Sequence, residues 1–195
     1  MPYEQYLSAG MHIGMKQQTK HMKSFIYKVR EDGLAILDLQ SIEKRIKIAA
    51  KFLSRFERIM VVCRKVVGWK AVKKFAEIVG GKAVTGRFLP GTITNPSFPG
   101  YYEPEVLLVT DPLYDSQAMK EAVKMHIPIV ALCDTSNETE LVDLIIPVNN
   151  KGRKSIAMVY WLLAKEILKE RKVIKEDAEF KYKLEEFEAK ERKKG

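Results

Sequence analysis

Three aspartates stand where metal-dependent or phosphate chemistry could take place. Asp38, Asp111 and Asp134 each follow an apolar segment that is predicted to be a β-strand. Ligands of a doubly wound sheet bind beyond the carboxyl ends of its strands, so three carboxylates there could hold a divalent metal ion or serve phosphoryl transfer. A metal-dependent phosphatase or nucleotide-binding enzyme is therefore one hypothesis. The structural alternative is favoured, because Asp111 precedes Pro112 and Asp134 precedes Thr135, contexts in which carboxylates bind turn amides.

The motifs that usually accompany such chemistry are missing from the sequence. It has no Gly-x-x-x-x-Gly-Lys-Ser/Thr loop, no Gly-x-Gly-x-x-Gly turn and no serine in a nucleophile elbow. Cys63 and Cys133 lie far apart in apolar segments, without a paired cysteine or clustered histidines, which favours two buried thiols over a disulfide or a zinc site. We therefore predict a protein that is not an enzyme and that uses no metal or cofactor.

A second suggestive stretch runs from Ala9 to Gly14, Ala-Gly-Met-His-Ile-Gly, and basic residues follow it closely. Two glycines permit close backbone approach to a phosphate, and His12 can donate a hydrogen bond to it. The RNA-binding residues predicted in this region are His12, Lys16, Lys20, His21, Lys23, Lys28 and Arg30. The alternative is that His12 is a packed or capping histidine beside a sharp turn.

The net charge of +9 is distributed unevenly along the 195 residues. Residues 1–104 hold 18 basic and 8 acidic side chains, a net +10, whereas residues 105–171 hold 8 basic and 10 acidic ones. Such one-sided positive charge is expected of a protein that binds a polyanion, most simply RNA. The alternative is like-charge repulsion that serves only solubility.

Two further basic clusters are candidates for phosphate contact. Arg64 and Lys65 follow one predicted strand, and the second cluster consists of Lys151, Arg153 and Lys154, between a predicted strand and a long helix. A helix N-terminus adds positive potential at the second cluster. A solvated charged face is the alternative for either cluster taken alone.

The segment Thr85 to Asn95, Thr-Gly-Arg-Phe-Leu-Pro-Gly-Thr-Ile-Thr-Asn, concentrates turn-forming residues around Arg87, a further predicted RNA contact. Pro90 fixes one backbone angle and the glycines permit conformations closed to other residues, so the loop is predicted to be rigid. A proline-rich continuation follows. It supplies three aromatic residues that could stack on unpaired bases or fill a pocket of a protein, and that we assign to partner binding: Phe98, Tyr101 and Tyr102.

The ten residues from Gly86 to Asn95 resemble the Gly-Arg-Phe-x-Pro-Gly-Thr-x-Thr-Asn signature of the family of small ribosomal subunit protein two. The resemblance continues in Val109-Thr-Asp-Pro, Ile127-Pro-Ile-Val-Ala-Leu-Cys-Asp-Thr, Ile146-Pro-Val-Asn-Asn-Lys-Gly and Trp161-Leu-Leu-Ala-Lys-Glu. Leu89 replaces the hydroxyl residue common at its position. The long helical hairpin of bacterial members is missing, so the chain resembles the archaeal type.

The resemblance implies a structural constituent of the small ribosomal subunit, which binds ribosomal RNA and neighbouring ribosomal proteins during translation and takes no small-molecule substrate. It also implies a flavodoxin-like strand order. Animal relatives carry the name laminin receptor, which would suggest adhesion at a cell surface. No apolar run here approaches the roughly 18 residues of a membrane helix, so we expect a cytoplasmic, ribosome-bound protein without a membrane partner.

The elements that must position these residues follow from the apolar pattern. Runs rich in β-branched residues predict strands at 34–39, 59–63, 82–85, 106–110, 127–133 and 144–148. Helical spacing predicts a helix capped by Ser41, one that stops at Gly80, one from Asp115 to Met125, and a long one from Ser155 to Arg171. The alternation predicts an α/β fold: a three-layer sandwich around a mainly parallel, flavodoxin-like sheet.

We expect one α/β RNA-binding domain over residues 1–171 and a charged tail over residues 172–195. The tail alternates in charge sign and keeps a sparse apolar stripe at helical spacing, which predicts an exposed or partner-docking helix. The stripe residues assigned to partner binding are Phe180, Leu184 and Phe187.

Overall fold

A five-stranded parallel sheet forms the centre of the molecule. The structure is a computed structural model and describes residues 3–175 and 179–189. The strands are β3 (Ile59–Cys63), β4 (Lys82–Thr85), β5 (Val106–Val109), β6 (Ile129–Cys133) and β7 (Leu144–Pro147). They lie in the order β4-β3-β5-β6-β7, and every neighbouring pair is parallel. This order is flavodoxin-like and confirms the predicted fold class.

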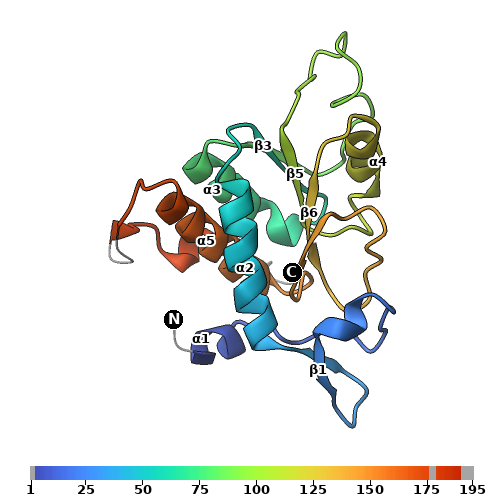
Figure 1. Cartoon of the computed structure of the whole chain (residues 1–195), viewed down its shortest axis with the longest axis vertical. Helices are drawn as coiled ribbons and strands as arrows, with labels where there is room; N and C mark the ends of the chain where they lie inside the picture. The colour runs from blue at the N-terminus through green and yellow to red at the C-terminus, as the bar shows by residue number, and fades with distance from the viewer. Residues whose placement is uncertain (1–2, 176–178, 190–195) are drawn as a thin grey trace, which may run out of the picture.

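Helices cover both faces of this sheet. One face carries α2 (Leu39–Leu53), α3 (Trp69–Val79) and α5 (Arg153–Glu170), and the other carries α4 (Ser116–Lys124). Figure 1 shows α4 on the far side of β5 and β6 from the other three helices. Side chains alternate between two buried cores along each strand: Val61 and Leu108 face the three helices, whereas Val62 and Leu107 face α4. Among the residues described, no helix is both long and apolar enough to span a membrane.

A short antiparallel hairpin precedes the sheet. Its strands are β1 (Ile26–Val29) and β2 (Ala35–Leu37), preceded by α1 (Tyr3–Ser8) and the 3-10 turn η1 (Met22–Phe25). The strand predicted at 34–39 is therefore shorter and lies outside the parallel sheet. Neither α1 nor β1 was predicted, because β1 is largely exposed and carries no alternating apolar signal.

The N-terminal cap of α2 differs from the predicted one. The cap of α2 is Asp38 rather than Ser41: its carboxylate accepts hydrogen bonds from Gln40 N at 3.3 Å and from Ser41 N at 3.0 Å. Ser41 is already inside the helix, and its hydroxyl donates to the same carboxylate at 2.6 Å. By contrast α3 ends as predicted, at Gly80 with φ of 82°. Asp38 therefore serves a helix cap.

The described part of the C-terminal tail packs back onto the helical face. Phe187 is fully buried in the core beside α5, just after the 3-10 turn η4 (Leu184–Glu186). The Phe180 ring lies 5.5 Å from that of Trp161, whose indole N–H donates to Tyr182 O at 2.8 Å. The prediction that this apolar stripe is exposed or docks on a partner is therefore wrong for Phe187. Phe187 is not accessible to a partner, because aromatic side chains of the tail cover apolar surface of α5.

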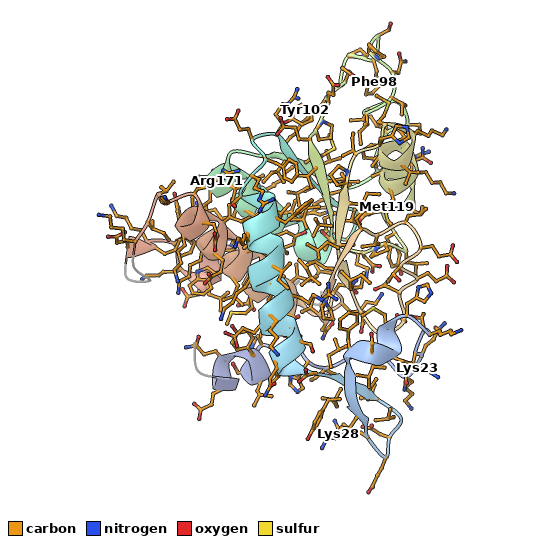
Figure 2. All side chains as sticks on the ribbon, in the orientation of Figure 1. Lys23, Lys28, Phe98, Tyr102, Met119 and Arg171 are labelled. Atoms are coloured by element: carbon orange, nitrogen blue, oxygen red, sulfur yellow. The ribbon has the colours of Figure 1, made fainter. Side chains whose placement is uncertain are left out.

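Arg171 joins the ends of three helices. It follows α5, and its guanidinium donates to Ser54 O at 3.3 Å, Val79 O at 2.7 Å and Phe56 O at 2.6 Å. Figure 2 labels it at the C-terminal end of α2. Carbonyls at helix C-termini have no partner within their own helix and carry partial negative charge, so one planar cation satisfies several of them.

We expect Arg171→Lys to lower the free energy of unfolding by about 2 kcal/mol, because an ammonium group cannot reach three separated carbonyls in one plane. Arg55→Lys is the matched control, since Arg55 is an exposed arginine near the end of α2. Guanidinium chloride unfolding followed by circular dichroism measures both. Equal midpoints for the two variants would contradict the role of Arg171.

Candidate nucleic-acid interface

The carboxyl edge of the parallel sheet is organised by a buried ion cluster around Asp111, the second residue after β5. Oδ2 of Asp111 accepts from Lys65 Nζ at 2.5 Å and from Lys151 Nζ at 3.1 Å, and Oδ1 accepts from Asn137 Nδ2 at 2.9 Å. Both ammonium groups also lie near the Tyr114 ring, at 4.5 and 5.8 Å from its centre. The carboxylate is therefore neutralised by side chains from the loops after β3 and β7.

This cluster changes the assignment of two predicted RNA contacts. The side chains of Lys65 and Lys151 are only 17% and 29% exposed. Burial lowers the pKa of Lys65, whereas at Lys151 the attraction of Asp111 outweighs burial and raises the pKa. Both lysines serve first as partners of Asp111, because removing either would leave a buried charge undercompensated.

Asp134 belongs to a turn after β6. Its Oδ1 accepts from Thr135 N at 2.7 Å, and its own amide donates to Asn137 Oδ1 at 2.8 Å. Asp38 caps α2 and lies outside the parallel sheet, so the three suspected aspartates do not converge. Within residues 3–175 and 179–189, no group of three or more histidine, cysteine or acidic side chains could hold a metal ion. The structural interpretation accounts for the contacts that these aspartates make, although Oδ2 of Asp134 is buried without a hydrogen-bond partner among the described residues.

The N-terminal segment lies against the same edge. Thr135 Oγ1 accepts from Met15 N at 2.8 Å, Thr19 N donates to Thr135 O at 2.9 Å, and Thr19 Oγ1 donates to Asn137 O at 2.9 Å. Gly14 is required for this approach, since a Cβ there would lie 2.5 Å from Thr135 Cγ2. The loop after β6, at the carboxyl edge of the sheet, thus lies against the protein's own chain.

The predicted phosphate cradle between Gly10 and Gly14 is not formed. The Gly10 amide donates to Leu7 O at 3.0 Å and the Gly14 amide donates to Ala35 O at 2.8 Å, so both are already satisfied inside the protein. His12 is half-buried, and burial lowers the pKa of its imidazole. The alternative of a packed histidine describes it better than a phosphate donor.

The remaining predicted RNA contacts gather at this edge because of the topology. Arg64 follows β3, Arg87 follows the neighbouring strand β4, and Lys154 lies in the first turn of α5, after β7. The N-terminal segment adds exposed residues beside the loop after β6, Lys16, Lys20 and His21, and further exposed ones on η1 and the hairpin: Lys23, Lys28 and Arg30. Parallel strands end at one edge, so residues distant in sequence share one end of the molecule.

Not all of these cations are equally available. Arg30 pairs with Asp32 at 3.3 Å, Arg153 pairs with Glu188 at 3.3 Å, and the His21 ring bonds Thr139 Oγ1 at 2.9 Å. No carboxylate in the described part of the chain forms an ion pair with four exposed lysines: Lys16, Lys20, Lys23 and Lys28. These four form the open part of the positive surface.

The loop after β4 is shaped by a residue that sequence reasoning missed. Glu121 of α4 is buried, and its carboxylate accepts from Gly91 N at 2.9 Å, Ile93 N at 3.3 Å and Thr94 Oγ1 at 3.3 Å. Gly91 has φ of 92°, a conformation that favours glycine. The sequence held one signal: Glu121 stands beside Ala122 on the apolar face of a predicted helix, where a lone carboxylate needs donors.

The aromatic residues beyond this loop lie at the opposite end of the molecule. Figure 2 shows Phe98 and Tyr102 far from Lys23 and Lys28. Tyr102 is held by Lys82, whose Nζ lies 4.6 Å from the ring centre, and the Tyr102 amide donates to Thr92 O at 2.9 Å. Phe98 and Tyr101 are partly exposed. The positive surface and the aromatic loop thus occupy two separate ends.

Comparison with known proteins gives a consistent match over most of the chain. The family model described as Ribosomal protein S2 matches residues 6–98 and 101–170. A relative from Staphylothermus marinus is 55% identical over 192 residues, which cover 97% of this chain and 87% of the relative. One from Thermoplasma acidophilum is 53% identical over 191 residues, covering 97% and 96%, and one from Saccharolobus solfataricus is 53% identical over 190 residues, covering 96% and 82%. Each is named small ribosomal subunit protein uS2.

We expect Glu121→Gln to lower the free energy of unfolding by about 2 kcal/mol, because the amide would turn an NH₂ group toward backbone donors. Proteolysis within residues 86–100 should also become faster. Glu138→Gln, at an exposed position, is the control and should change neither quantity. Unchanged stability and cleavage in the Glu121 variant would contradict the assigned role.

The carboxyl group of Asp115 should make the stability of the folded protein depend on pH. It is buried and accepts from Arg64 N at 2.9 Å; burial raises its pKa to about 6, although amide hydrogen bonds oppose the shift. The folded state holds this proton more tightly than an unfolded aspartate with a pKa of 3.8, so the stabilisation is complete below pH 3.8 and is lost as pH rises through about 6.

Between pH 4 and pH 7, the parent should therefore lose more stability than Asp115→Asn does, by an amount on the order of 2 kcal/mol. Denaturant titrations at each pH measure the difference, in which the titrations of other groups cancel. Parallel pH dependences for the two proteins would show that Asp115 titrates normally.

Proposed function

The chain belongs to the ribosomal protein S2 family, and from that premise we propose that it is a structural constituent of the small ribosomal subunit which binds ribosomal RNA and neighbouring ribosomal proteins. In this proposal it works in the cytoplasm, bound to the ribosome. The relatives named above match nearly the whole length of this chain, and each is named as a small-subunit protein. The proposed role adds the RNA and protein contacts that the structure is suited to make.

One observation carries the RNA-binding proposal: the open lysines of residues 16–28 lie at the same edge of the sheet as Arg64, Arg87 and Lys154. Each lysine that meets a phosphate releases counterions, which supplies affinity without any reading of sequence. Figure 2 shows Lys23 and Lys28 at one end of the molecule, on η1 and β1. Carboxylates such as Asp111 and Glu121 are turned inward, so they weaken the outward field less than exposed acids would.

Recognition in this proposal is by shape. The N-terminal segment is held by backbone and side-chain hydrogen bonds to Thr135 and Asn137, so its lysines have a fixed register against the edge. Phosphate contacts from a rigid support position a protein on a folded RNA surface. The partly exposed Phe98 and Tyr101, at the other end, are the proposed contacts with a neighbouring protein.

The contacts of the three suspected aspartates support a non-catalytic role. Asp111 is neutralised by two lysines, Asp134 bonds its own turn and Asp38 caps a helix. The loop after β6 is covered by residues 14–19. We therefore propose a non-catalytic role.

Charge reversal tests the RNA surface. We expect glutamate at Lys16, Lys20, Lys23 and Arg87 together to weaken binding to small-subunit ribosomal RNA, and to reduce the slope of log affinity against log salt by about 0.9 for each phosphate that the variant no longer neutralises. The control reverses four exposed lysines away from this edge: Lys120, Lys124, Lys175 and Lys181. Filter binding across a salt series measures both variants. Equal affinities and slopes for test and control variants would reject the assignment.

A further inference from the structure

The β1–β2 hairpin contains an irregularity that exposes an aromatic side chain. Ile26 pairs with Leu37 and Lys28 pairs with Ile36, so the single residue between them, Tyr27, has no partner on β2. Such a bulge bends the strand and re-aims its side chains. Tyr27 is 72% exposed, more than any other large hydrophobic residue that the structure describes. A tyrosine held outward by a bulge is not explained by packing.

A groove opens beside this tyrosine. It is a cavity of about 640 Å³ between α1, the hairpin and the start of α2, with apolar walls from Leu7, Ile36 and Leu39. Cavities of this size hold small organic groups. Polar residues line it as well, among them Gln40 and His12, although the Nδ1 atom of His12 is itself buried and has no hydrogen-bond partner among the described residues.

The charge around the groove favours an anionic occupant. Lys28 and Arg30 line it together with Tyr27, although Arg30 also pairs with Asp32 at 3.3 Å. Lys16 lies beside the hairpin turn, with its Cδ 3.8 Å from the position of a Cβ on Gly33. The acidic residue of the lining, Asp38, has its carboxylate engaged in capping α2. A group that is flat and apolar on its faces, polar at its edge and attached to negative charge would match these walls.

We propose that this groove binds one unpaired nucleotide of the RNA, with the base stacked on the Tyr27 ring and its phosphate beside Lys28. Leu7 and Leu39 cover the apolar part of the base, and the Gln40 side chain on the groove wall bonds its edge. The inference rests on the proposed function and names the part of the RNA that this end of the protein takes. Stacking suits any base, so the site adds affinity and register without a strict sequence requirement.

The test compares three variants of the full chain on archaeal small-subunit ribosomal RNA. Tyr27→Ala removes the ring, Tyr27→Phe keeps it, and Val29→Ala trims an exposed neighbour on the same strand that does not line the groove. Circular dichroism confirms that each variant is folded, and filter binding over a salt series gives affinity and slope. Ultraviolet cross-linking of the parent complex, followed by mass spectrometry, reports whether the peptide containing Tyr27 carries a nucleotide.

Support would be a loss of affinity of about 10-fold for Tyr27→Ala at an unchanged salt slope, near-parental binding of the other two variants, and a cross-link at Tyr27. The proposal is overturned if Tyr27→Ala binds as tightly as a parent that itself binds the RNA, which would leave the proposed function intact. Unchanged RNA affinity with loss of a small-subunit protein would also overturn it, in favour of a protein occupant. A parent that does not bind this RNA would reject the proposed function and the nucleotide site together.

Discussion

The buried Asp111, held between Lys65 and Lys151, is the interaction on which the rest of the molecule depends. It fixes the loops after β3, β5 and β7 at the carboxyl edge of the sheet, and Asn137 extends the same network to the loop after β6. The N-terminal segment packs against this network through hydrogen bonds of Met15 and Thr19 to Thr135 and Asn137. A parallel sheet usually offers this edge to a ligand. Here residues 14–19 of the protein's own chain lie against the loop after β6.

Several carboxylates lie in the interior, although others near the same surface, such as Glu31 and Glu138, are exposed. Asp111, Asp115 and Glu121 are buried and accept hydrogen bonds from backbone amides, lysines or side-chain amides of the interior. The lysines of residues 16–28 remain outside. Inward carboxylates shape the loops, because one carboxylate oxygen can satisfy more than one donor. The same side-chain placement leaves the lysines at the surface, where they would serve the proposed affinity for RNA.

Much of this fold could be predicted from apolar periodicity, including β3 and β4 to the residue and the end of α3 at Gly80. The hairpin strand β1 could not, because an exposed strand with a bulge lacks the alternation that identifies a half-buried one. The predicted basic positions were chosen by residue type alone. Which of them stay open, as Lys16 does, and which are buried against a carboxylate, as Lys65 is, depends on contacts between residues 46 positions apart in the chain. The same limit applies to Phe187. The charged residues around it predicted an exposed or partner-docking helix, whereas its side chain packs in the core.

Amide hydrogen exchange of the free chain and of its complex with small-subunit ribosomal RNA tests the central claim most directly. The account predicts that the amides of Met15 and Thr19, already bonded to Thr135, exchange slowly in both states. RNA should slow amide exchange over residues 20–33, which lie outside the segment bonded to Thr135. Rapid exchange at Met15 and Thr19 in the free chain, with protection appearing there and at Asp134 only when RNA or a nucleotide is added, would show an open ligand site at this edge and would contradict the account.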